Sequence, residues 1–139
     1  MDELQVVRYL NESEVFSGLS PEDLEPLHGQ CRETLFDDGA VIVEQGAPAE
    51  SVYVLVEGSV SRLEPPEGTS TELGHIEQGS LVGLTALSGF DTWRATLRAE
   101  GTVRAIKIPL ASLKQMLHDN PAASYVVMKR VAAKIPMRV

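Results

Sequence analysis

Turn-forming residues recur about every ten residues through the middle of this 139-residue chain. Most of these turns are marked by a glycine after a polar residue, because glycine adopts the positive φ angles that tight turns need. They fall at residues 37–39, 45–46, 57–58, 65–68, 78–79 and 100–101. Segments this short do not accommodate long helices. The sequence therefore predicts about eight short antiparallel strands that form a sandwich or roll.

The segments between these turns define the predicted strands. Most of them are rich in β-branched or aromatic residues, which favour strands, and several alternate apolar with polar side chains. The predicted strands include residues 34–36, 41–43, 51–56, 59–63, 72–76, 93–99 and 103–108.

Helix signals flank the strand region on both sides. Before it, Ser20 and Pro21 precede two acidic residues, which is the pattern of a capped helix start. After it, apolar residues at helical spacing follow Pro109, and Asn120 with Pro121 repeats the start pattern. We predict a mainly β single domain over residues 1–139, with N-terminal helices at 1–32, an antiparallel β-roll at 33–108 and C-terminal helices at 110–136.

Composition argues against several classes of partner. The formal net charge of −8 disfavours nucleic-acid binding through overall charge. The apolar runs are all shorter than the ~18 residues that a membrane helix needs, so we expect no membrane segment. Asp2 and Glu3 do not suit a secretory signal. We therefore expect a cytoplasmic location.

Residues suited to metal binding or catalysis do not cluster in the sequence. The single cysteine, Cys31, excludes an internal disulfide, and we expect it to be a small core residue at a helix end. His28, His75 and His118 are far apart and lack metal-ligand spacing. No Walker loop, Gly-x-Ser-x-Gly or paired catalytic carboxylates occur. We therefore predict no metal site and no enzymatic activity.

The candidate functional segment is residues 79–96, read as Gly-Ser-Leu-Val-Gly-Leu-Thr-Ala-Leu-Ser-Gly-Phe-Asp-Thr-Trp-Arg-Ala-Thr. It predicts a loop, one helical turn at residues 84–88, a second loop and a strand with Arg94 at its mouth. Backbone N–H groups at a helix start, beside a cation, form a shape that can hold an anion. Leu84 and Trp93, however, stand where a phosphosugar site would have polar groups.

Four further motifs follow one another in a fixed order. They are Phe-Ser-Gly-Leu-Ser-Pro-Glu-Asp-Leu at 16–24, Gly-Ala-Val-Ile-Val-Glu-Gln-Gly-Ala-Pro-Ala at 39–49, Val-Tyr-Val-Leu-Val-Glu-Gly-Ser-Val at 52–60 and Asn-Pro at 120–121. Together they resemble the cyclic-nucleotide-binding domain of the catabolite-activator and FNR type of bacterial regulator, from about residue 15 to 135. The resemblance implies a β-roll of the double-stranded β-helix or jelly-roll type.

The same family has a phosphate-binding cassette that reads Gly-Glu-(Leu/Ile)-Ala-Leu, then a loop, then Pro-Arg-Ala-Ala-Thr. Its glutamate accepts from a ribose hydroxyl and its arginine pairs with the cyclic phosphate. Here residues 83–87 read Gly-Leu-Thr-Ala-Leu, so Leu84 replaces the glutamate. Without gaps, Trp93 takes the arginine position and Arg94 points to the opposite face of the strand. A one-residue gap would restore Arg94.

The resemblance implies a set of candidate ligand-binding residues in the two halves of the cassette. They are Gly83, Leu84, Thr85, Ala86, Trp93, Arg94, Ala95 and Thr96. The family implies cyclic AMP or cyclic GMP as the ligand. The alternatives are another small ligand, or a segment that only turns the chain. Trp93 either stacks on a ligand or packs at the mouth of the roll.

The resemblance also implies how the domain acts. A ligand in the cassette would shift the helices after residue 108, and a downstream part or a dimer partner would read the shift. The candidate homodimer stripe on the last helix is Ser124, Met128, Val131 and Ile135. The family's helix-turn-helix would lie beyond Val139, so we do not expect this chain alone to bind DNA. The hypothesis is a non-enzymatic regulatory module with a degenerate cassette. The alternative is a ligand-free interaction or dimerisation domain of a larger signalling or transcription protein.

Overall fold

The computed structural model describes residues 3–64 and 71–138, so the turn predicted at 65–68 lies outside the described residues. The helices are α1 (Glu3–Glu12), α2 (Pro21–His28), α3 (Leu84–Leu87), α4 (Leu110–Asp119) and α5 (Pro121–Arg138). The strands are β1 (Arg32–Phe36), β2 (Val41–Val43), β3 (Ser51–Glu64), β4 (Thr71–Ile76), β5 (Leu81–Val82) and β6 (Thr96–Pro109). None of the described helices combines the length and apolar content needed to cross a bilayer.

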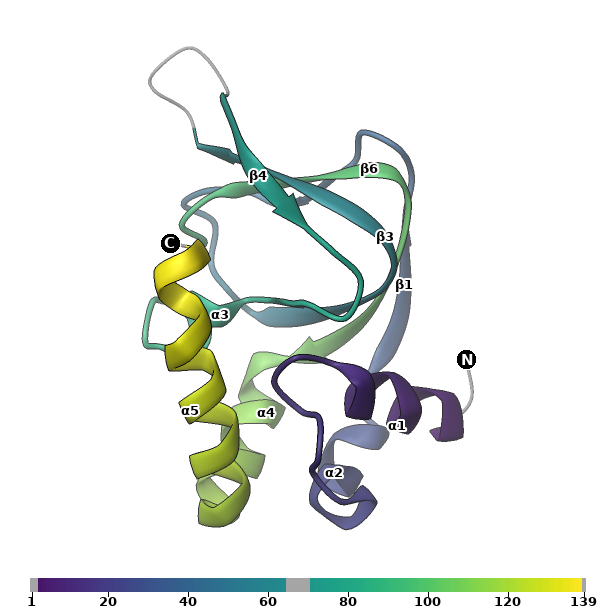
Figure 1. The fold of residues 1–139 in the computed structure, drawn as a ribbon, viewed down its shortest axis with the longest axis vertical. Coiled ribbons are helices and arrows are strands. Elements are labelled where there is room, and N and C mark those ends of the chain that lie inside the picture. The colour runs from purple at the N-terminus through teal and green to yellow at the C-terminus, as the bar shows by residue number, and fades with distance from the viewer. Residues whose placement is uncertain (1–2, 65–70, 139) are drawn as a thin grey trace.

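The strands pair in one antiparallel sheet with the order β1-β6-β3-β4. β2 also pairs with β6, and β5 pairs with β3, so each of the four shorter strands pairs with one of the two long strands, β3 or β6. Figure 1 shows this sheet rolled over itself, with α1, α2 and α4 at one end and α5 upright along one side. The predicted fold class, an antiparallel β-roll with flanking helices, is confirmed.

Two of the predicted turns, at residues 57–58 and 100–101, are wrong, because β3 runs through the first position and β6 runs through the second. The pairing register of these strands shifts on both sides of Glu57, which marks a β-bulge. Gly58 has a φ of +92°, and a Cβ there would lie 2.6 Å from the Thr102 carbonyl oxygen. This glycine therefore permits a close approach of two backbones instead of ending a strand. The described sheet consequently has six strands and not about eight.

The core has two parts, which we name by the side of the sheet on which they lie. The helix-facing core joins the helices to one side of the roll, and Phe16, Leu24, Ile108 and Leu113 are among its fully buried members. The roll interior is a separate cluster that contains residues of β2, β3 and β6. A ligand held inside the roll would compete with the side chains of this second cluster.

The prediction that Cys31 is a core residue is confirmed, since this residue, shortly after the end of α2, is buried in the helix-facing core. Burial raises the pKa of its thiol to about 11 from an ordinary value of 9.0. At pH 8 this shift lowers the reactive thiolate fraction about a hundredfold. We therefore expect Cys31 to react with Ellman's reagent at least about a hundredfold more slowly in the folded protein than in urea. The reaction is followed by the absorbance of the thiolate that the reagent releases. Equal rates would show that the site opens freely.

Candidate functional site

The first half of the candidate site begins where β5 turns into the short helix α3. Gly83 precedes α3 with a φ of +127°, and a Cβ at this position would lie 2.4 Å from Val52 Cγ1. The helical turn predicted at residues 84–88 is confirmed as α3, with Ser88 as its C-cap. Gly83 thus allows the cassette helix to lie directly on β3.

The side chains of α3 are largely turned toward the protein. Leu84, Ala86 and Leu87 are buried in the helix-facing core, and Leu84 is 5% exposed. Thr85 is half-buried, and its carbonyl oxygen accepts from the backbone N–H of Phe90 at 3.1 Å. The residue at the family's glutamate position therefore belongs to the packing between roll and helices.

The second half of the site places Trp93 inside the roll. Trp93 is 8% exposed and lies in the same cluster as Tyr53 and Leu97. Two backbone hydrogen bonds fix the loop, from Trp93 N–H to the Ala47 carbonyl and from Gly46 N–H to the Trp93 carbonyl, both 2.9 Å. The strand predicted from residue 93 begins only at Thr96, so Trp93 packs from a loop.

Arg94 lies on the outside, next to Trp93 in sequence but on the opposite side of the chain. Its side chain is exposed, and its guanidinium carbon lies 4.6 Å from the centroid of the Phe90 ring. Such a cation–π contact is electrostatic and leaves the guanidinium accessible to water. Ala95 is buried, and the Thr96 hydroxyl accepts from the Gln45 backbone N–H at 3.1 Å. The structure therefore buries Leu84 and Trp93 in different parts of the core, and it does not turn Arg94 inward.

Sequence reasoning missed two residues that shape this site. Phe90 holds Arg94 at the surface. Glu14, in the turn after α1, accepts from the Leu81 backbone N–H at 2.8 Å and so fixes the strand that leads into α3. The Glu14 contact spans 67 positions in sequence, so no local pattern predicts it.

Burial of the Tyr53 hydroxyl at the roll interior raises the pKa of this side chain.

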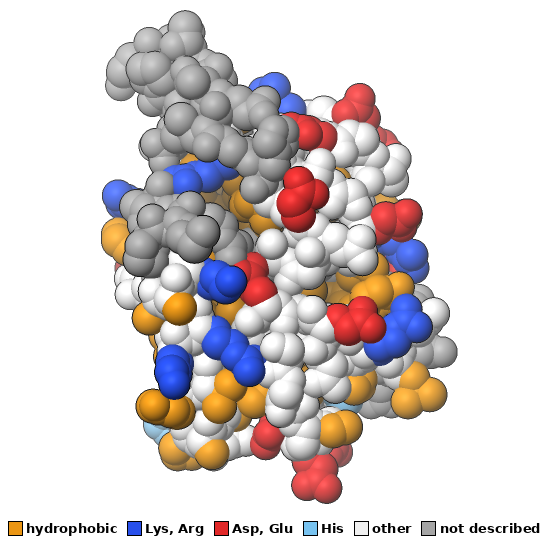
Figure 2. Space-filling view, in the orientation of Figure 1, with side chains coloured by type: hydrophobic (Ala, Val, Ile, Leu, Met, Phe, Trp, Pro, Cys, Tyr) orange, Lys and Arg blue, Asp and Glu red, His pale blue; other side chains and the backbone are white. Residues whose placement is uncertain are grey.

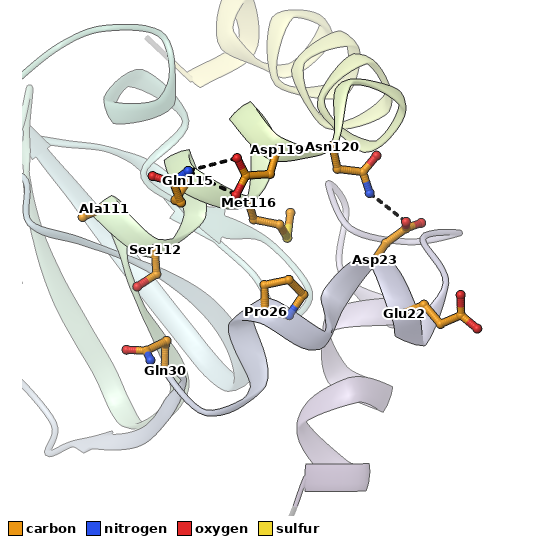
Figure 3. A pocket seen from close by; sticks show the side chains of 10 residues that line it. All are labelled: Glu22, Asp23, Pro26, Gln30, Ala111, Ser112, Gln115, Met116, Asp119 and Asn120. Carbon is orange, nitrogen blue, oxygen red and sulfur yellow. Dashed lines mark hydrogen bonds between the residues drawn. The ribbon is translucent and has the colours of Figure 1, made fainter.

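A groove of about 530 Å³ lies elsewhere, between α2 and α4. Figure 3 shows acidic and amide side chains at its rim, with Pro26 and Met116 between them. Asn120 donates to Asp23 at 2.8 Å across one end of it. Hydrogen bonds from Asn120 and Ser20 lower the pKa of Asp23, so this carboxylate stays charged and paired at neutral pH. Over residues 3–64 and 71–138, no cluster of His, Cys, Asp and Glu is suited to a metal ion.

The predicted dimer stripe on α5 divides between the surface and the core. Ser124 and Met128 are half-buried, and Met128 packs against the helix-facing core. Val131 is 1% exposed within the chain's own core, so it has no surface to offer a partner in this conformation. The side chain of Ile135 lies outside the described part.

The exposed face of α5 carries a different set of residues from the predicted stripe. Tyr125 is 69% exposed, and Lys129 Nζ lies 5.8 Å from its ring centroid. Figure 2 shows basic and hydrophobic side chains together over this helix.

The described chain is a β-roll with a short helix between β5 and β6 and with a long helix laid against that short helix. The family described as "Cyclic nucleotide-binding domain" matches residues 33–120, which is more than half of the chain. The chain therefore belongs to the cyclic nucleotide-binding domain family.

Individual relatives are distant. The chain is 26% identical over 118 residues to the "cAMP-activated global transcriptional regulator CRP" of Escherichia coli O6:H1, covering 84% of this chain and 54% of that protein. It is 28% identical over 130 residues to "Glutaminase 1" of Bradyrhizobium diazoefficiens, covering 94% of this chain and 21% of the enzyme. The chain thus spans between about a fifth and about a half of these curated relatives.

A solved structure covers nearly the whole fold. The putative cyclic nucleotide-binding protein from Geobacter metallireducens GS-15 superposes with a TM-score of 0.81 at 26% identity. The alignment covers 94% of this chain and 96% of that one. The architecture of the described residues is therefore that of a cyclic nucleotide-binding domain over nearly all of their length.

Proposed function

We propose that this chain is a non-enzymatic regulatory module whose phosphate-binding cassette is degenerate. The observation that carries the proposal is the pair of neighbours Trp93 and Arg94: the tryptophan packs inside the roll and the arginine stacks on Phe90 outside it. The cassette helix and its glycine are kept, but no arginine of this loop points into the interior. The domain keeps the family's architecture with an altered ligand site.

The size of the effect follows from the two replaced contacts. A charge-assisted hydrogen bond to a buried anion contributes roughly 1.5–3 kcal/mol. Loss of both the glutamate and the arginine contacts removes about 3–6 kcal/mol, which is about two to four decades of affinity. Leu84 also adds an apolar group where a ribose hydroxyl would need an acceptor.

The regulatory character of the family supports the non-enzymatic part of the proposal. The chain aligns with only 21% of the length of the glutaminase and with 54% of the length of the regulator CRP. The described residues offer no metal cluster, and the sequence lacks a nucleophile motif.

The second candidate function is a ligand-free interaction or dimerisation domain. It is favoured by the exposed face of α5, where Tyr125 and Lys129 lie side by side and the sequence from residue 120 to 139 contains no acidic residue. A partner would meet this face and not the buried Val131.

Titration with cyclic nucleotides tests the proposal directly. We expect neither cyclic AMP nor cyclic GMP to release heat or change the fluorescence of Trp93, the one tryptophan, up to millimolar concentration. The physical reason is that Arg94, the cation of the cassette loop, is exposed and stacked on Phe90 outside the roll. Calorimetry and fluorescence are run on the same samples, with the Escherichia coli regulator CRP as the positive control for cyclic AMP.

Micromolar binding accompanied by a Trp93 signal would overturn the degenerate-cassette proposal and make the chain a working sensor. Sedimentation velocity on the unliganded protein then addresses the second candidate. A dimer that dissociates on Tyr125→Ala supports the α5 face as its interface, whereas a dimer unaffected by this change argues against it.

A further inference from the structure

The long helix α5 packs on the cassette helix α3. The two helices contact each other directly. Leu84 and Leu87 of α3 and Val127 and Val131 of α5 belong to the same buried core. Figure 1 shows α3 beside the upper, C-terminal half of α5. The packing of α5 on the cassette helix therefore lies within an apolar core.

Leu84 has a specific part in this core because it is 5% exposed. A glutamate at the same place would have to bury its charge among apolar side chains or move α5 away. The chain thus has an apolar side chain at the position where its family holds a ligand-binding carboxylate, and this side chain is buried in the core that also contains Val127 and Val131 of α5.

Arg130 holds the middle of α5 to the N-terminal turn. Its Nη1 donates to the Val15 carbonyl at 3.3 Å, to the Ser17 hydroxyl at 3.1 Å and to the Ser17 carbonyl. Val15 and the neighbouring Phe16 are completely buried, so the turn that receives Arg130 is itself fixed in the core. These carbonyl groups would otherwise need another donor.

Asn120 holds the first turn of α5. Its side-chain amide donates to Asp23 at 2.8 Å, and its side-chain oxygen accepts from the Ala123 backbone N–H at 3.1 Å. Asp23 is at the same time part of the capping box that Ser20 forms at the start of α2. Figure 3 shows this hydrogen bond joining the two helix starts.

From these three attachments we propose that the chain holds α5 closed on the cassette by its own side chains and so needs no ligand to reach that state. The inference rests on the proposed function, since a degenerate cassette leaves no ligand to close it. A ligand can shift an equilibrium only by its different affinity for two states, and here the closed state is already secured. The exposed face of α5 is then available to a partner whether or not a ligand is present.

Hydrogen–deuterium exchange read by mass spectrometry tests the proposal. In the unchanged protein, α5 peptides are expected to be protected to a degree similar to those of β6, without added nucleotide. Leu84→Glu is expected to speed exchange in α5 by at least about tenfold while β3 and β6 keep their protection. Arg130→Gln should act in the same direction, and it carries the test if Leu84→Glu does not fold.

Lys129→Gln is the matched control, because Lys129 adjoins Arg130 on α5 but is exposed, with its Nζ over the exposed Tyr125 ring. It should leave α5 protection unchanged. Rapid exchange of α5 in the unchanged protein, or full protection in folded Leu84→Glu and Arg130→Gln variants, would overturn closure. Nucleotide binding in the titration would overturn the degenerate cassette alone, so the two failures are distinguishable.

Discussion

Replacing Gly83 with alanine is expected to lower the free energy of unfolding by about 3–5 kcal/mol, because two costs add. The first is backbone strain, since an L-residue rarely adopts the φ of +127° found there. The second is overlap, since the new methyl would lie 2.4 Å from Val52 Cγ1. Equilibrium urea denaturation followed by far-UV circular dichroism measures the loss.

Gly89→Ala separates the two costs. Gly89 also has a positive φ, +107°, but no heavy atom lies within 4 Å of the position its Cβ would take. Its expected loss is only about 1–2 kcal/mol, from strain. Adding Val52→Ala to Gly83→Ala should recover part of the difference. Equal losses for the two glycine variants would mean that α3 does not lie directly on β3.

Glycine illustrates what could and could not be predicted from the sequence. The turns at residues 37–39, 45–46 and 78–79 separate elements as expected. The same signal at 57–58 and 100–101 marks positions inside long strands, because positive φ serves a bulge as well as a turn. Only the pairing partner distinguishes the two cases, and the local sequence does not contain it.

The last helix shows a second limit of the sequence. Its 3.6-residue period predicts an apolar stripe, but the period does not say what covers that stripe. The structure covers Val131 with the chain's own core, which includes α3. The exposed Tyr125 and Lys129 were not predicted as a surface pair. The sequence period does not contain the tertiary packing between α3 and α5, which are about 40 residues apart in sequence.

The short helix of the cassette segment is predictable because it depends on local chemistry. A glycine followed by apolar residues and then by loop residues predicts a short helical turn, and α3 is found there. Strand alternation would place adjacent side chains on opposite sides, but Trp93 and Arg94 lie in the loop before β6. What holds each side chain in place, Phe90 for the arginine and the roll interior for the tryptophan, depends on the fold.

Replacing Trp93 with alanine is expected to lower the free energy of unfolding by about 3–5 kcal/mol, because a large side chain is removed from a packed interior. Arg94→Ala is the matched control at the next position. It removes only an exposed cation–π contact and should cost less than about 1 kcal/mol. Circular dichroism is the probe for both variants, since Trp93→Ala removes the one tryptophan.

The same two variants test the function through binding. Trp93→Ala opens space in the roll, but the space gains no cation, because Arg94 stays stacked on Phe90 outside. We therefore expect its calorimetric titration with cyclic AMP to remain flat. A large loss of stability from Arg94→Ala together with a small one from Trp93→Ala would place the arginine inside. That result would return the cassette to the register of a phosphate-binding site.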